Sequence, residues 1–132
     1  PSENEIDGQT YPLEGHFVYK TDNGKITVIS ILYNYGDENQ ALKQIWDKMP
    51  QAANTETELP QAISLDDFYP EDKDYYNFEG SLTTPPCTEG VNWIVFKNQE
   101  TVSKEQVEKF TQTLGFENNR PIQDTNGRQI KE

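Results

Sequence analysis

The stretch from Tyr76 to Trp93, YNFEGSLTTPPCTEGVNW, constrains the fold more than any other part of the chain. Each proline fixes its own φ and removes a backbone donor, and it pushes the residue before it toward an extended conformation. Thr83 to Pro86 should therefore form a stiff, non-helical segment that holds the threonine hydroxyls in place. From composition alone, the simplest interpretation is a structural turn between two strands.

Two further features of this stretch can be predicted. Gly80 is expected to turn the chain sharply before the threonines, through a backbone angle that other residues resist. An X-Pro bond can be cis, and the bond before Pro86 is the candidate.

Length and composition limit the classes of protein to which the chain can belong. The 132 residues fit one domain with a single core, and no apolar run approaches the roughly 20 residues of a membrane span. The formal net charge of −12 argues against nucleic acid or an anionic membrane as a partner, because both attract a basic face. Cys87 is the only cysteine, so no disulfide can form within the chain, and a lone cysteine is most often a small buried side chain.

Alternating polar and apolar residues predict a strand over residues 11–20, with Glu14, His16 and Val18 on one face. The other face would carry Tyr11, Leu13, Phe17 and Tyr19. Residues 25–35 are nearly continuously apolar, which favours a central strand covered on both sides. The Asn-Gly turn signal between the two runs predicts an antiparallel hairpin over residues 11–35.

Helical periodicity predicts about three turns of helix from Ala41 to Met49, closed by Pro50. A second helix should begin after Ser103, with Gln106 completing a capping box, and end at Gly115. One helical turn capped by Ser64 and a buried strand over residues 91–97 complete the expected elements.

His16 is the only histidine in the chain. A catalytic zinc uses three protein ligands and a water, so a lone histidine is a poor metal candidate on spacing alone. Glu14, two residues earlier on the same strand face, strengthens the case. Its carboxylate could accept the second ring N–H and orient the imidazole, as partners of metal-binding histidines normally do.

Two segments together resemble a known family. GSLTTPPC followed by TEGVNWIVF, and PSENEIDGQTYPLEGHFV near the start of the chain, resemble the α-class carbonic anhydrases, in particular the secreted bacterial members. The resemblance implies a mixed α/β, β-dominated fold, with a large twisted, mostly antiparallel central sheet and peripheral helices. It also implies that residues 1–132 are the C-terminal part of a single carbonic anhydrase domain, which would be incomplete at its N-terminal side.

By that resemblance, the function is zinc-dependent, reversible hydration of carbon dioxide to bicarbonate and a proton, by attack of a zinc-bound hydroxide. His16 would be a Zn2+ ligand and Glu14 its hydrogen-bonding partner, with two further histidine ligands expected upstream of this chain. Glu3 would be the buried acid that accepts a hydrogen bond from Thr83, and Thr84 would bind bicarbonate. The apolar substrate pocket would consist of Leu82, Val18, Val28, Val91 and Trp93.

The chain departs from the family at two positions. Asn4 stands where many members have histidine, and Phe78 where many have tyrosine. Because those two side chains bond each other in the family, losing both polar groups leaves neither unpaired. We therefore expect the substitutions to tune the activity and not to abolish it.

The resemblance also implies partners and a location. Carbon dioxide and bicarbonate would be the substrates, sulfonamides and anions would be inhibitors, and a homodimer is compatible with the family. Cys87 would form a disulfide with a cysteine that is not in this chain. The protein would be periplasmic or extracellular.

Two alternatives stay open. A catalytically inactive carbonic-anhydrase-like binding module would lack a zinc ligand in the upstream segment. An acidic, β-rich extracellular module with no site would leave the spacing of Glu3, Glu14, His16 and Thr83 as a coincidence. One ligand cannot hold zinc tightly and unpaired strand edges would be exposed, so we expect the 132-residue segment alone to be inactive.

Overall fold

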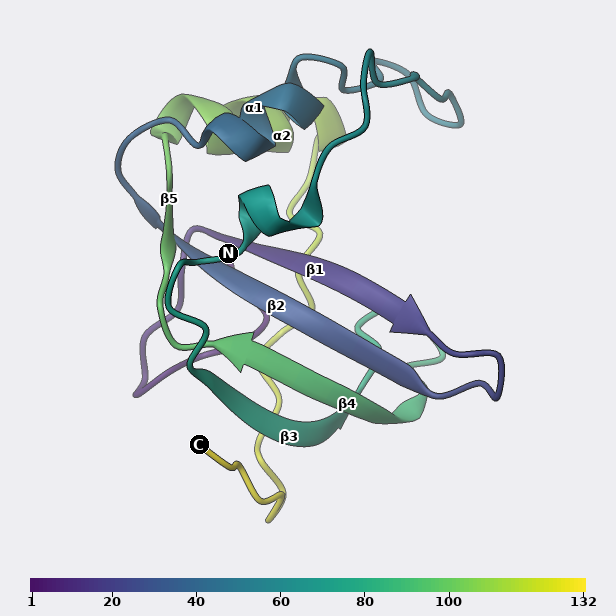
Figure 1. The fold of residues 1–132 in the computed structure, drawn as a ribbon, viewed down its shortest axis with the longest axis vertical. Coiled ribbons are helices and arrows are strands. Elements are labelled where there is room, and N and C mark those ends of the chain that lie inside the picture. The colour runs from purple at the N-terminus through teal and green to yellow at the C-terminus, as the bar shows by residue number, and fades with distance from the viewer.

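A mixed β-sheet forms the centre of the structure, a computed structural model that describes all of residues 1–132 (Figure 1). Its strands are β1 (Leu13–Lys20), β2 (Ile26–Tyr35), β3 (Tyr75–Ser81), β4 (Glu89–Phe96) and β5 (Glu100–Val102). The helices are α1 (Gln40–Trp46), the 3₁₀ helix η1 (Leu65–Phe68) and α2 (Lys104–Leu114). None of them is long and apolar enough to cross a membrane.

The order of the strands places β2 in the middle of the sheet. The order is β1-β2-β4-β3, and β5 pairs with the far end of β2. β1 and β2 are antiparallel, as are β3 and β4, whereas β4 and β5 both run parallel to β2. The predicted hairpin over residues 11–35 and the β-dominated fold are confirmed, with the parallel pairings making the sheet mixed within this chain.

The two faces of the sheet bury separate clusters of side chains. One cluster joins the sheet to the helices, and its fully or largely buried members are Ile31, Tyr33, Ala41, Leu42, Phe68, Phe96 and Val102. The other cluster lies on the opposite face and consists of Tyr11, Val28, Leu32, Val91, Trp93 and Val95. Tyr11 was expected on the same face as Leu13 and Phe17, but it precedes β1 and packs with the second cluster because strand alternation does not extend to it.

The helices form much as their capping residues predict. Ser103 and Gln106 complete the capping box of α2, and Gly115 ends it with a left-handed φ of 78°. Ser64 caps η1. α1 is shorter than the three turns predicted, because residues after Trp46 make tighter bonds three residues back, from Lys48 N–H to the Ile45 carbonyl and from Met49 N–H to the Trp46 carbonyl.

One buried amide joins the two helices, which lie together at one end of the sheet (Figure 1). The side chain of Gln106 accepts hydrogen bonds from the N–H groups of Ser103 (3.1 Å) and Asn39 (2.9 Å), and it donates to the carbonyl of Asn39 (2.9 Å). Asn39 is itself the N-cap of α1. The amide therefore fixes the start of α1 against the start of α2.

We expect the substitution Gln106→Ala to lower the free energy of unfolding of the full-length protein by about 1–2 kcal/mol, because it leaves the half-buried N–H groups of Asn39 and Ser103 without their partner. Urea denaturation measures the change. Gln112→Ala, on the exposed side of the same helix, is the matched control and should change stability by less than about 0.5 kcal/mol. Equal losses from the two substitutions would contradict the role given to Gln106.

Candidate active site

The strand register brings the predicted site residues onto the sheet face away from the helices. Glu14 and His16 point to this face of β1, and His16 lies directly opposite Ser30 of β2. The next row across the sheet is Val18, Val28, Trp93 and Phe78. The prediction that Glu14, His16 and Val18 share one face is therefore confirmed by the strand register.

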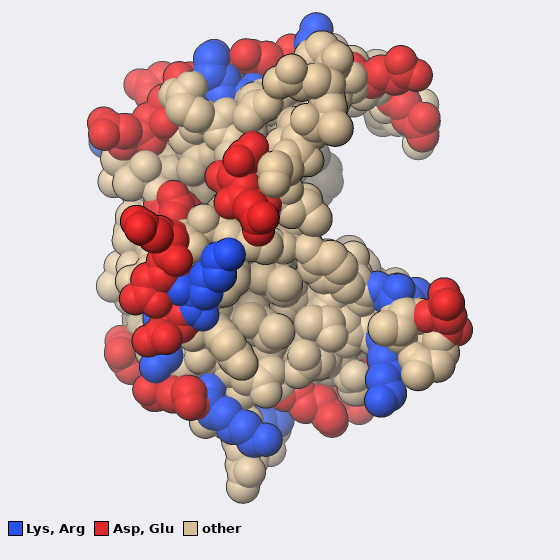
Figure 2. All heavy atoms as spheres, viewed as in Figure 1, with Lys and Arg blue, Asp and Glu red and all other residues tan.

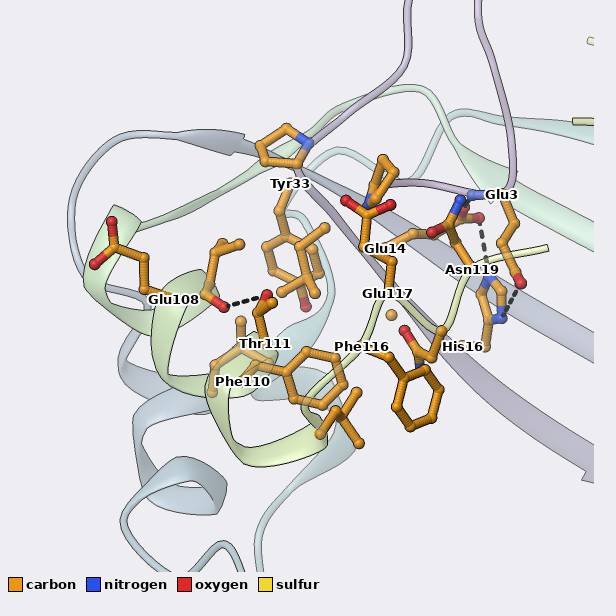
Figure 3. A pocket seen from close by; sticks show the side chains of 18 of the residues that line it. Glu3, Glu14, His16, Tyr33, Glu108, Phe110, Thr111, Phe116, Glu117 and Asn119 are labelled. Carbon is orange, nitrogen blue, oxygen red and sulfur yellow. Dashed lines mark hydrogen bonds and ion pairs between the residues drawn. The ribbon is translucent and has the colours of Figure 1, made fainter. Parts of the chain in front are cut away.

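The imidazole of His16 lies between two carboxylates (Figure 3). Nε2 is 3.0 Å from Glu14 Oε1, and Nδ1 is 3.7 Å from Glu3 Oε2. The ring also makes an edge contact with Trp93, at 5.0 Å between centroids and an interplanar angle of 86°. The side chain is 20% exposed, so most of the ring is shielded from solvent.

The carboxylate of Glu14 is held from several directions and is almost fully buried, with 2% of its side chain exposed. Its Oε2 accepts from the backbone N–H groups of Glu3 (2.7 Å) and Asn4 (2.9 Å). Its Oε1 accepts from the Asn4 side-chain amide (2.6 Å) and from the Ser30 hydroxyl. A buried charge with this many donors is compensated in place.

Burial alone would raise the pKa of the Glu14 carboxyl group. The closeness and charge of His16, with the bonds from Ser30 and Asn4, outweigh that effect and lower the pKa to about 2. Glu14 is therefore ionised throughout the neutral range, and it favours the ring tautomer that carries a proton on Nε2.

Glu3 has a different partner from the one predicted. Its Oε1 accepts from the backbone N–H of Arg120 (2.5 Å), and its Oε2 faces His16. The predicted hydrogen bond from Thr83 is not formed in this structure, in which Oε2 makes only a 3.7 Å contact with His16 Nδ1. The guanidinium of Arg120 donates to the hydroxyl of Ser81 (3.1 Å), so the C-terminal segment after α2, the tail, is tied to the last residue of β3.

The threonine and proline segment forms a tight turn beside the histidine. The Pro85–Pro86 bond is cis, as predicted. Cys87 N–H donates to the carbonyl of Thr84 (2.9 Å), and Leu82 N–H donates to that of Thr88 (2.9 Å). Thr83 is half-buried, Thr84 is exposed, and Cys87 is a half-buried free thiol.

Gly80 is needed for space and not for the unusual backbone angle predicted. Its φ is not positive, but an added Cβ would come within 2.9 Å of Trp93 Cδ1 and 3.1 Å of Nε1. The Trp93 indole donates to the carbonyl of Ser81 (3.0 Å) and packs against His16. The glycine thus allows the indole to lie flat over β3 beside the imidazole.

A cavity of about 730 Å³ opens between the site and α2. Figure 3 shows Phe110 and Thr111 across this cavity from His16, with Phe116 alongside. The predicted site residues Glu3, Glu14, His16, Thr83 and Thr84 all line it. The structure therefore brings all five residues to one hollow.

The predicted apolar pocket is only partly assembled. Leu82 packs with the buried cluster of Val28, Val91 and Trp93, in which each valine is 1% exposed. Val18 is 60% exposed at the neighbouring position of β1. Trp93 lines a second cavity, of about 1100 Å³, that also contains Glu3 and Thr83.

No group of three or more histidine, cysteine, aspartate or glutamate side chains is placed so as to hold a metal ion. The chain offers one oriented imidazole, which can supply one ligand of such a site. On the face seen in Figure 2, acidic side chains spread over the helices and loops without a continuous basic patch, in keeping with the net charge of −12.

Sequence reasoning missed two residues of the site. Ser30 was read only as part of an apolar strand, although its spacing from Val28 places it on the face of His16. Arg120 contributes through its backbone N–H, for which no local signal exists.

Comparison with known proteins identifies the family. The sequence model of the eukaryotic-type carbonic anhydrase family matches residues 1–132. The chain therefore belongs to that family, the α-class. It is 46% identical over 132 residues to the carbonic anhydrase of Neisseria gonorrhoeae, covering 100% of this chain and 52% of that protein. It is 44% identical over 130 residues to the carbonic anhydrase of Pectobacterium carotovorum, covering 98% and 53%.

A solved structure gives the same result. The α-carbonic anhydrase of Thermovibrio ammonificans, in complex with sulfanilamide, matches with a TM-score of 0.95 at 46% identity, over 98% of this chain and 57% of that one. The resemblance seen in the sequence is confirmed, as is the fold. The chain spans about half the length of the curated relatives that it matches.

We expect Gly80→Ala to displace the Trp93 indole, because a Cβ cannot stand 2.9 Å from its ring. The NMR resonance of the Trp93 indole N–H in the full-length protein should shift. The same proton should exchange with solvent faster, because its hydrogen bond to the Ser81 carbonyl is weakened. Gly15→Ala is the control, since its Cβ would find its nearest atom at 3.4 Å, on Tyr33. A Trp93 resonance unchanged by Gly80→Ala would contradict the packing described.

Proposed function

We propose that the protein to which this chain belongs is a zinc-dependent enzyme that interconverts carbon dioxide and bicarbonate. The observation that carries the proposal is the setting of His16. Its Nε2 lies 3.0 Å from the buried, ionised carboxylate of Glu14, and the residue lines a cavity together with Thr83 and Thr84. Family membership supports the same reaction.

The one imidazole ligand that the chain supplies is suited to zinc. Because Nε2 lies against Glu14, Nδ1 is the nitrogen available to a metal, and Glu14 would orient the ring and raise its basicity. A catalytic zinc site takes three protein ligands and keeps one position open. The other two ligands would come from residues outside these 132, because no further cluster of ligands surrounds His16.

When bound, zinc supplies the Lewis acidity that turns a water molecule into a nucleophile near neutral pH, and carbonic anhydrases are the best-known case. Thr83 is suited to orient that nucleophile. Glu3 Oε2 has no hydrogen bond here and only a 3.7 Å contact with Nδ1. If Nδ1 binds a metal, the Glu3 carboxylate is free to accept a hydrogen bond from the Thr83 hydroxyl. The Thr83 oxygen can then only accept a hydrogen bond from the nucleophile.

Carbon dioxide is apolar and needs an apolar wall close to this point. Trp93 borders His16, and Leu82, Val28 and Val91 pack behind it. Val18 would extend the wall along β1. Thr84 is exposed in the cavity and carries a hydroxyl suited to bicarbonate, and the rigid turn also presents the Thr83 backbone N–H to an oxygen of the substrate.

The alternative of an inactive binding module is less well supported. The relatives matched over nearly the whole chain are themselves named carbonic anhydrases, and Glu3, Glu14, His16, Thr83 and Thr84 line one cavity. We also propose a periplasmic or extracellular location, a disulfide from Cys87 to a cysteine outside this chain, and a homodimer. These three rest on the resemblance to secreted bacterial members.

We expect His16→Ala in the full-length protein to remove bound zinc and to lower the rate of carbon dioxide hydration by at least about a hundredfold, because the site loses a ligand. Metal analysis and stopped-flow hydration assays measure the two effects. Lys25→Ala, in the exposed turn between β1 and β2, is the control and should keep both. Full zinc content in the His16 variant would contradict the assignment of His16 as a ligand.

Sulfanilamide should bind the full-length protein only when zinc is present. A related enzyme has been solved in complex with this compound. Isothermal titration of the zinc-loaded protein is expected to show binding, which treatment with a chelator abolishes and added zinc restores. Equal binding to the metal-free protein would show that the compound does not report on a metal centre.

A further inference from the structure

The Glu14 carboxylate has more donors around it than it can fully satisfy. An ionised carboxylate offers about four lone-pair positions. Five donors approach it: the backbone N–H groups of Glu3 and Asn4, the Asn4 side-chain amide, the Ser30 hydroxyl and His16 Nε2. Three of them converge on Oε1, so they compete for the same oxygen.

His16 is the donor that loses this competition. Its Nε2 lies 3.0 Å from Oε1, yet it is buried and not aligned for a hydrogen bond with any partner. The Asn4 amide and the Ser30 hydroxyl both make aligned bonds to the same oxygen. The contact that should orient the imidazole is therefore weaker than its distance suggests.

Ser30 is an unusual residue for its position. It is 0% exposed, and the residues beside it on the same face of β2, Val28 and Leu32, belong to an apolar cluster. Its hydroxyl makes one side-chain hydrogen bond, to Glu14. Packing alone would be served by alanine, so the hydroxyl matters chiefly through Glu14.

We propose that Ser30 is a positioning residue that limits how strongly Glu14 binds the His16 ring, and that it thereby sets how tightly His16 can hold a metal. Asn4 acts in the same direction through its side chain. Removing either donor frees a lone pair of Oε1 for Nε2, while the two backbone N–H groups keep the carboxylate in place. The effect on the ring stands on the structure alone, and the effect on the metal rests on the proposed function.

The test compares Ser30→Ala, Asn4→Ala and the double variant in the full-length protein. The first readout is the NMR position of the His16 Nε2–H proton, identified by its absence in a His16→Asn variant. The second is the zinc dissociation constant, measured by competition with a chelator. Ser103→Ala is the control, because it also removes a hydrogen-bonded serine hydroxyl, one that accepts from Gln106 N–H at the start of α2, away from Glu14.

The expected result is a downfield shift of the His16 ring proton in both single variants, larger in the double variant. Zinc binding should become tighter by up to about tenfold, since the loss of an orienting partner typically costs ten- to a hundredfold and here the partner is strengthened. Ser103→Ala should change neither. A ring proton that stays in place in Ser30→Ala, or that moves equally in Ser103→Ala, overturns the inference.

The two hypotheses fail separately. If the wild-type protein binds no zinc, the proposed function is refuted, and the position of the ring proton still decides the role of Ser30. If the wild-type protein binds zinc and Ser30→Ala weakens that binding, Ser30 supports Glu14 instead of competing with His16, and the inference is wrong.

Discussion

The arrangement depends on one buried charge, the carboxylate of Glu14. Placing an ion inside a protein costs several kcal/mol unless donors surround it. Here the hydrogen-bond donors come from Ser30 of β2 and from the N-terminal loop, whose backbone N–H groups at Glu3 and Asn4 bond Oε2. Satisfying Glu14 therefore also brings Glu3 to the histidine, so that one electrostatic requirement assembles the site.

The two faces of the sheet determine what surrounds the Glu14 carboxylate. Helices cover one face, and the other face carries the apolar cluster on which Trp93 and His16 meet. The turn after β3 adds the threonines, and Gly80 near the end of β3 leaves room for the Trp93 indole. The tail closes the arrangement through Arg120, which binds both Glu3 and Ser81. Segments far apart in the sequence thus converge on a single ring.

Local patterns predicted much of this. Period-two alternation placed Glu14 and His16 on one face, and the capping box at Ser103 fixed the start of α2. The assignment of Glu3, Thr83 and Thr84 to the same site as His16 came from the family resemblance and not from spacing. What could not be predicted depends on distant partners: Ser30 reaches Glu14 across β1 and β2, and Arg120 meets Glu3 over 117 positions. Gly80 was predicted for the wrong reason, because its close neighbour Trp93 is on another strand.

The most direct test of the account is the anomalous X-ray signal of zinc in crystals of the full-length protein. The account predicts a zinc peak bonded to Nδ1 of His16, with Nε2 of the same ring still directed at Glu14 Oε1. Zinc bonded to Nε2, or a structure with zinc that lies away from His16, would contradict it.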